Sequence, residues 1–304
     1  MFVHRLLRAF LSAAFAFYIV YLVKNDALQY YIAPKMELYV KLSAIALMLF
    51  AVVQTVSAFA YLRARQPEAC DCHHPPSPSL LKNAATYGVL LSPLLFGYLL
   101  PDLALGSDLV DKKGIVLSRS QPDSAAADSR AEPEPEPKAA ADSNGMTEAQ
   151  LRDSFLTGDL YEDQYAGMAA SLMLQDPILV RDDAFLEIIT AIDLFMHRFA
   201  GKTIQVEGFV YRPEGIAPNE FVVARMAMDC CSADATPYGF LVESANAPAF
   251  AEDTWVRVTG KIGTVEWDGF DIVKIEADSA EAIDSPDTPY VYPNYEAIDE
   301  AQIP

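Results

Sequence analysis

The sequence predicts an α+β membrane protein with transmembrane helices at its N-terminal end and a small OB-like β-barrel near its C-terminal end. Three observations predict this fold class. Long apolar blocks fill residues 1–113, an acidic stretch rich in proline and alanine follows, and residues 202–277 alternate between apolar and polar side chains. The expected divisions are a transmembrane domain (1–113), a disordered acidic linker (114–146), a soluble helical and β-barrel domain (147–284) and an irregular C-terminal tail (285–304).

The N-terminal part contains three apolar blocks of about the length that a bilayer requires, roughly 20 residues per helix. The blocks cover residues 6–23, 42–62 and 84–105. The last one contains Pro93 and is expected to break near Pro101. We therefore expect a multi-pass protein of the cell membrane that contacts the lipid bilayer through three helices.

A cleaved signal peptide is the alternative interpretation of the first block. Arg5 and Arg8 would form its charged start, and the small residues at 12–16 would offer a cleavage site. The apolar run continues beyond that site, which favours an anchor. Basic residues flank both ends of the three blocks in nearly equal numbers, but two precede the first block and one follows it, which favours a cytoplasmic N-terminus. The soluble domain is then expected outside the cytoplasm.

The soluble half is strongly acidic. Residues 1–113 carry 10 Lys and Arg against 7 Asp and Glu, whereas residues 114–304 carry 12 against 35. Proteins that bind single-stranded nucleic acid need a positive groove, so no nucleic-acid partner is expected. No enzyme is expected either, because the sequence lacks a Ser-His-Asp set, a phosphate-binding loop and a metalloprotease helix motif.

The segment after the linker predicts three helices. One starts at a Thr-x-x-Gln capping box at 147–150, a second covers 161–174, and a third covers 185–199, where apolar residues recur at helical spacing. We expect Asp182 or Asp183 to cap the start of the third helix.

Five short strands are expected after these helices. Their number, the glycines at their bends and the Trp-Val-Arg-Val-Thr-Gly-Lys segment suggest a Greek-key barrel of OB type. The expected strands are 203–211, 220–229, 238–243, 254–261 and 270–277.

Two adjacent cysteines stand at the end of the second expected strand. Cys230 and Cys231 lie between Asp229 and Asp234, and thiolate and carboxylate groups are ligands for zinc or another soft divalent metal. No cofactor is certain from this pattern, because one cysteine could instead pack into the barrel as a small apolar residue. We expect Arg225 to form an internal ion pair with Asp229 or Asp234.

A second group of donors lies between the second and third apolar blocks. Cys70, Cys72, His73 and His74 offer four metal-type ligands within five residues. The alternative is an exposed loop that binds no ligand. With three membrane spans, this loop lies on the opposite side of the membrane from the soluble domain. The two cysteine groups are therefore expected to form separate sites.

Three sequence strings are specific when taken together. They are Gly208-Phe-Val-Tyr-Arg212, Cys230-Cys-Ser-Ala-Asp-Ala235 and Trp255-Val-Arg-Val-Thr-Gly260. With them the chain resembles the YcgQ-like family of bacterial membrane proteins, over nearly its whole length except the acidic linker. The resemblance implies an accessory subunit that works with a multi-spanning, YcgR-like membrane permease. It implies no particular substrate.

These observations lead to one function hypothesis and two alternatives. The hypothesis is a non-catalytic, membrane-anchored accessory subunit of a permease, which handles a soft metal ion or a thiol-reactive solute through its cysteines. The first alternative is a membrane-tethered thiol-redox or metal-sensing protein that acts without a permease. The second is a structural binding module whose cysteines only contribute packing.

Overall fold

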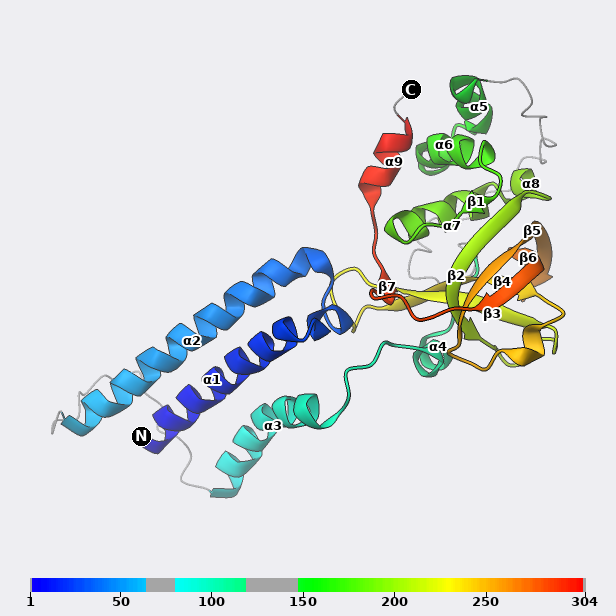
Figure 1. Ribbon diagram of the computed structural model, residues 1–304. Coiled ribbons are helices and arrows are strands. Elements are labelled where there is room, and N and C mark those ends of the chain that lie inside the picture. Colours follow the sequence, from blue (N-terminus) through cyan, green and yellow to red (C-terminus); the bar gives the residue numbers. More distant parts are fainter. Residues whose placement is uncertain (1, 64–79, 119–146, 303–304) are drawn as a thin grey trace. The chain divides into compact units, whose positions relative to one another are not determined.

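The computed structural model describes residues 2–63, 80–118 and 147–302 of the chain (Figure 1). They belong to two compact units, Met1–Leu103 and Ala104–Pro304. The architecture is α+β, as predicted, with apolar helices in the first unit and a large β-sheet in the second. The second donor group lies outside the described residues: Cys70, Cys72, His73 and His74.

The first unit consists of long apolar helices. Helices α1 and α2 run side by side along most of their length (Figure 1), and a short 3-10 turn, η1, connects the end of α1 to the start of α2. The element bounds are α1 Phe2–Lys24, η1 Ala27–Tyr30, α2 Pro34–Arg63 and α3 Leu80–Leu99.

Two of the described helices are long and apolar enough to cross a membrane, namely Phe2–Lys24 and the segment Pro34–Ala60. Length and composition fit membrane anchoring or, for the first helix, a signal sequence. The predicted third span is not confirmed. Helix α3 has 20 residues, but its first turn contains Lys82 and Asn83 and its interior contains Pro93.

The second unit begins with segment 104–118, which contains helix α4, and continues with the helices that precede the sheet. The capping box is confirmed: the Gln150 amide donates to the Thr147 hydroxyl, and the Thr147 amide donates to the Gln150 side chain. The helix expected over 185–199 is interrupted at Phe195. The helices are α4 Ser107–Lys113, α5 Glu148–Phe155, α6 Leu160–Met173, η2 Asp182–Ala184, α7 Phe185–Leu194, α8 Met196–Phe199, η3 Ala247–Ala249 and α9 Tyr295–Gln302.

The expected cap of α7 is wrong. The residue at its N-cap is Ala184, and no side chain bonds to the first amides of the helix. Asp182 lies instead in the preceding 3-10 turn, where its carboxylate pairs with Arg225 at 2.6 Å. The Asp182 carboxylate, which the sequence pattern assigned to the start of the helix, therefore forms an ion pair with the buried Arg225 guanidinium.

The sheet contains the five expected strands and two additional short ones. Its order is β1-β2-β5-β6-β4-β3-β7. The strands are β1 Ile178–Leu179, β2 Thr203–Tyr211, β3 Glu220–Ala227, β4 Thr236–Glu243, β5 Trp255–Trp267, β6 Phe270–Ala282 and β7 Tyr290–Val291.

The predicted small OB-like β-barrel is not confirmed, and the sheet does not form a closed barrel. Strand β2 pairs with β5 from Thr203 to Phe209, but it pairs with β3 only from Phe209 to Tyr211. The sheet is therefore curled, and β2 and β3 pair over only a short part of their length. Strands β1 and β7 extend the sheet beyond five strands.

The apolar core of the second unit fills the space between its helices and the sheet. Phe185 and Ile192 of α7 are fully buried, and so are Ile204 of β2 and Val258 of β5. Helices α5, α6, α7 and α9 lie together on one side of the sheet (Figure 1). This core makes the sheet a fixed support for the loops at its ends.

The C-terminal tail is not irregular as predicted. Tyr290 and Val291 pair in parallel with the end of β3, and Ile298 of α9 is buried in the core. The tail contains several prolines, a two-residue strand and an eight-residue helix, and a strand of two residues is too short to show an alternating pattern in the sequence.

Candidate functional site

The two cysteines lie in the loop of residues 228–235 that connects β3 to β4. Met228 and Ala235 at the two ends of this loop are fully buried. The Met228 amide also donates to the Val291 carbonyl at 3.0 Å, so the sheet fixes the start of the loop. Between these ends, Cys230 and Cys231 are only half-buried. The thiols are therefore accessible from solvent and do not belong to the core.

The Asp234 carboxylate organises the loop. Its Oδ1 accepts the Asp229 amide at 3.0 Å, and its Oδ2 accepts the amides of Cys230 at 2.7 Å and Cys231 at 3.2 Å. The Asp234 amide in turn donates to the Cys231 carbonyl at 3.0 Å, which closes a tight turn. One short acidic side chain thus holds the backbone on which both thiols stand.

The two sulfur atoms are neighbours without being bonded. Their separation is 3.5 Å, whereas a disulfide bond measures about 2.05 Å. The sulfur atoms of Cys230 and Cys231 and a carboxylate oxygen of Asp234 all lie within 4.8 Å of one another. A single ion could contact all three donors with small adjustments of the side chains.

The electrostatics of the loop favour a protonated thiol beside an ionised carboxylate. Hydrogen bonding to the Asp234 carboxylate, hydrogen bonding to the Cys231 thiol and burial raise the pKa of Cys230 to about 12. Burial also raises the pKa of Asp234, but hydrogen bonds from the Cys230 side chain and from the three amides outweigh it and hold that pKa below its ordinary value. A bound cation reverses this balance, since it favours the thiolate and displaces the thiol proton.

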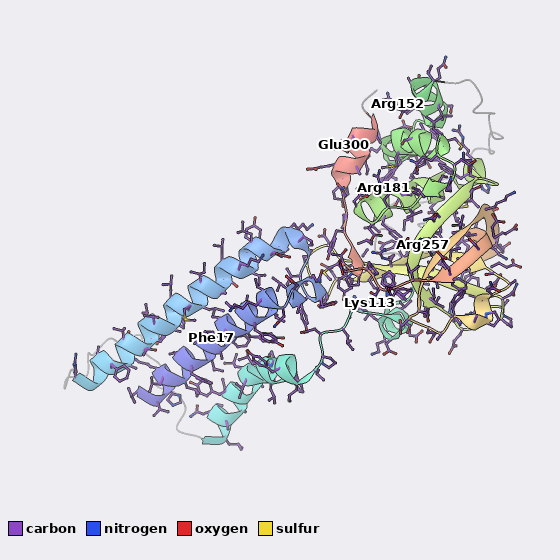
Figure 2. All side chains as sticks on the ribbon, in the orientation of Figure 1. Phe17, Lys113, Arg152, Arg181, Arg257 and Glu300 are labelled. Atoms are coloured by element: carbon purple, nitrogen blue, oxygen red, sulfur yellow. The ribbon has the colours of Figure 1, made fainter. Side chains whose placement is uncertain are left out.

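Lys113 holds the outer part of the same loop. Its Nζ donates to the carbonyl of Ala233 at 3.0 Å and to that of Ala235 at 2.7 Å. It lies at the end of α4 (Figure 2), and the start of α4 is held by Asp253, which accepts the amide and hydroxyl of Ser107. Sequence reasoning missed Lys113 because 120 residues separate it from the loop and no local pattern connects them.

The structure brings together three of the four residues predicted for this site. Asp229 is the exception: its side chain is exposed, and the described three-donor group contains Cys230, Cys231 and Asp234. Asp229 contributes its backbone amide to Asp234 instead of a ligand.

The predicted ion pair of Arg225 with Asp229 or Asp234 is wrong. The Arg225 side chain is 1% exposed, pairs with Asp182 and lies 5.0 Å from the centre of the Trp255 ring. Arg225 sits inside the unit, so its charge does not belong to the cysteine loop.

The donor set fits a thiophilic cation. Two sulfurs and one carboxylate oxygen are ligand types that zinc and other soft divalent metals accept. A carboxylate has about four lone-pair positions, and those of Asp234 accept three backbone amides and the Cys230 thiol, so an ion would take the position that the thiol proton leaves. Three donors leave at least one position of a tetrahedral ion open to water or to another ligand.

Comparisons with known proteins cover both units. Residues 7–116 match the model described as the DUF1980 N-terminal domain, and residues 155–293 match the DUF1980 C-terminal domain, which includes the cysteine loop. The chain is 25% identical over 303 residues to UPF0703 protein YcgQ of Bacillus subtilis (strain 168), covering 94% of this chain and 98% of that protein. No solved structure matches the chain significantly.

Proposed function

Because the chain belongs to the YcgQ-like family of DUF1980 proteins, we propose that it is a non-catalytic, membrane-anchored accessory protein whose β3–β4 loop handles a soft metal ion. Family membership does not indicate an activity, so the evidence for metal handling comes from the loop alone. The observation that carries it is the grouping of the Cys230, Cys231 and Asp234 donor atoms within 4.8 Å on an accessible loop.

The anchoring part of the proposal is a multi-pass arrangement. Helices α1 and α2 supply two spans and α3 a third, whose Lys82 lies near the membrane surface. With a cytoplasmic N-terminus, three spans leave the second unit, and with it the cysteine loop, outside the cytoplasm. Labelling of single engineered cysteines from either side of intact cells tests this orientation.

The chemistry of the loop favours a role in transferring an ion to another ligand, in preference to storing it. Structural zinc sites have four protein ligands, whereas this loop offers three and keeps both thiols half-exposed. An incoming ligand can take the open position and remove the ion. The apo thiol also holds its proton, so release of the ion is assisted whenever a proton returns to Cys230.

A multi-spanning permease is the proposed partner. Residues 9–23 and 42–62 carry no charged side chain, and solute paths through membranes usually contain ionisable groups or broken helices. A separate protein would then provide the path for the ion. Affinity purification of the tagged full chain from native membranes should recover a permease in stoichiometric amount; a homogeneous preparation without one contradicts this part.

An OB-type interpretation of the inner strands is part of the proposal. The pairings β2–β3, β3–β4, β4–β6, β6–β5 and β5–β2 support it, with β4 and β6 parallel and the other four pairs antiparallel. This would be a partly open barrel with the cysteine loop between its second and third strands. An experimental structure of the second unit tests it.

A thiol-redox function is the second candidate, and the 3.5 Å distance between the sulfurs favours it. The Cys230 and Cys231 thiols would lose two protons and two electrons to a disulfide oxidant, and an S–S bond would form between them. The raised pKa of Cys230 opposes this reaction, since the thiolate is the nucleophile. Thiol trapping in intact cells, with and without reductant, decides: a pair that always stays reduced excludes the redox function.

Metal analysis of the purified full chain tests the metal proposal. The chain has a second cysteine group, so the wild type is compared with Cys230→Ser/Cys231→Ser and, as a matched control, with Cys70→Ser/Cys72→Ser. We expect the first double variant to lose about one equivalent of zinc or cadmium, with affinity reduced about 100-fold or more. Equal metal content in the wild type and Cys230→Ser/Cys231→Ser contradicts the proposal.

A further inference from the structure

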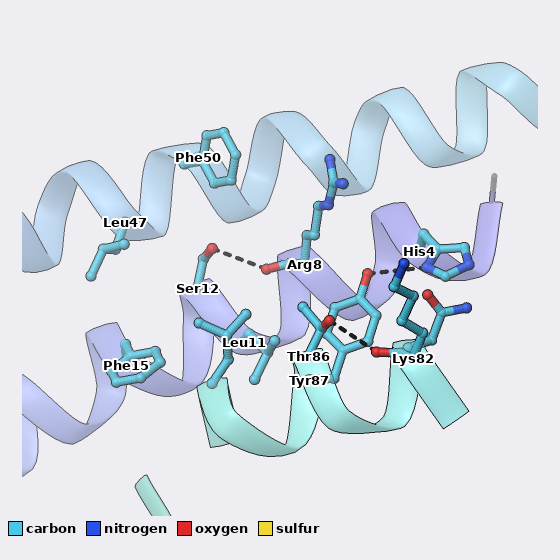
Figure 3. Close-up of a pocket in the computed structure, with 12 residues that line it drawn as sticks. His4, Arg8, Leu11, Ser12, Phe15, Leu47, Phe50, Lys82, Thr86 and Tyr87 are labelled. Carbon is cyan, nitrogen blue, oxygen red and sulfur yellow. Dashed lines mark hydrogen bonds between the residues drawn. The ribbon is translucent and has the colours of Figure 1, made fainter. Parts of the chain in front are cut away.

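The first unit contains a cavity that the proposed metal function does not use. It has a volume of about 550 Å³ and is lined by residues of α1, α2 and α3 (Figure 3). All three helices contribute to it within the same unit. The cavity therefore lies in the part of the chain for which membrane anchoring is proposed.

One end of the cavity is polar and basic. Arg8 and Lys82 contribute a guanidinium and an ammonium group, and the His4 imidazole bonds to the Tyr87 hydroxyl at 3.1 Å and stacks on the Tyr87 ring. His4, Lys82 and Tyr87 gather at the same end in Figure 3. No acidic side chain lines the cavity within the described part of the chain. This composition attracts an anion.

The rest of the cavity is apolar. Phe15 and Leu47 lie at the end away from His4 and Lys82, and Leu11 and Phe50 line the wall between (Figure 3). A small inorganic anion would leave this apolar wall without a partner. An amphipathic molecule with an anionic head and a hydrocarbon chain matches both parts at once.

We propose that this cavity is a binding site for an anionic phospholipid. Its phosphate group contacts Arg8 and Lys82, and one acyl chain lies along the wall formed by Leu11, Phe15 and Phe50. Basic side chains on apolar helices reach toward the membrane interface, where phosphate headgroups lie. An anionic headgroup therefore complements the charge of the Arg8 and Lys82 side chains that line the cavity. The inference rests on the proposed membrane anchoring and is independent of the cysteine loop.

The test uses the full chain reconstituted into nanodiscs, where native mass spectrometry counts retained lipids. Phosphatidylglycerol is compared with zwitterionic phosphatidylcholine for the wild type and for Arg8→Gln/Lys82→Gln. We expect the double variant to lose the preference for phosphatidylglycerol by about 10- to 30-fold, since it loses two cationic contacts. The control Lys24→Gln removes an exposed charge from the opposite end of α1 and should retain the preference.

Further arms separate the other outcomes. Arg8→Lys/Lys82→Arg keeps both charges and should keep the preference, which shows that the positive charge at these two positions carries the recognition. Equal retention of both lipids by the wild type overturns the inference. Displacement of the lipid by millimolar inorganic phosphate also overturns it, because the site would then recognise a soluble anion. A chain that fails to enter nanodiscs refutes the anchoring itself, whereas lost lipid preference in an inserted chain refutes only this site.

Discussion

The two units contain similar apolar side chains but differ in how far they bury them. In the second unit the core is closed: Phe185 is 0% exposed, as are Ile192 and Val258. In the first unit Phe17 is 61% exposed, and only 22% of the apolar window of α1 and 17% of that of α2 is buried within the chain. Core helices of soluble proteins bury this surface against their own fold. The difference teaches that, among the described residues, the first unit does not cover the apolar surface of its own long helices, which supports the proposed anchoring.

The largest expected effect comes from removing one phenylalanine from each unit. Phe185→Ala leaves a cavity in the closed core and should lower the free energy of unfolding of the second unit by about 3–5 kcal/mol. Phe17→Ala removes an exposed ring and should change that free energy by less than about 0.5 kcal/mol. Denaturant unfolding of the full chain in detergent, followed by the fluorescence of Trp255 and Trp267, measures both. Equal losses of unfolding free energy in the two variants would contradict the difference in burial between the units.

A second prediction concerns the packing of backbone within the sheet. A Cβ on Gly260 would overlap the backbone carbonyl of Glu276, which cannot move without breaking the β5–β6 ladder. Gly260→Ala should therefore cost about 2–3 kcal/mol. In the same strand, a Cβ on Gly263 would lie 3.6 Å from the nearest atom, the Lys274 carbonyl oxygen, so Gly263→Ala is the matched control with a cost below about 1 kcal/mol. Unfolding curves of the two variants measure the difference.

Most of the regular elements could be predicted from the sequence, because each has a local signal. The bounds of β2 follow from the alternation at Thr203–Tyr211, and the capping box at Thr147 follows from a four-residue pattern. The third membrane span is not confirmed, since the apolar block at 84–105 continues past the end of α3 at Leu99 and the first turn of this helix contains Lys82 and Asn83.

What the sequence could not supply is contact between distant segments. The pairing of Arg225 with Asp182, the three amides on Asp234 and the link from Lys113 to the loop all depend on the tertiary fold. The nearness of Cys230 and Cys231 could be predicted because the two residues are adjacent in the sequence, and their role as donors stays a prediction. Asp229 was included for the same reason, but the three-donor group of the structure contains Asp234 and not Asp229.

The third prediction concerns the pH dependence of metal binding by the cysteine loop. The pKa of Cys230 is raised, so this thiol is protonated near neutral pH and must release its proton to an incoming ion. Metal affinity should therefore rise with pH by about tenfold per unit for this one proton. Isothermal titration with cadmium in the Cys70→Ser/Cys72→Ser background measures the slope between about pH 6 and pH 8. A flat profile would show that Cys230 does not act as a thiolate ligand.

The smallest expected effect concerns the link between α4 and the loop. Lys113→Met removes the bonds to the carbonyls of Ala233 and Ala235 and should destabilise the loop by about 1 kcal/mol, with little effect on global stability. Hydrogen exchange of the amides at 229–235 should become about fivefold faster. Lys112→Met, which changes the exposed neighbour, is the control and should leave these rates unchanged.

The central claim is that the two adjacent sulfurs bind an ion together. X-ray absorption spectroscopy of the zinc-loaded Cys70→Ser/Cys72→Ser chain tests it most directly, because Cys230 and Cys231 are then the only thiols left. The account predicts two sulfur ligands at about 2.3 Å and lighter atoms in the remaining positions. A zinc shell made only of nitrogen and oxygen would contradict it.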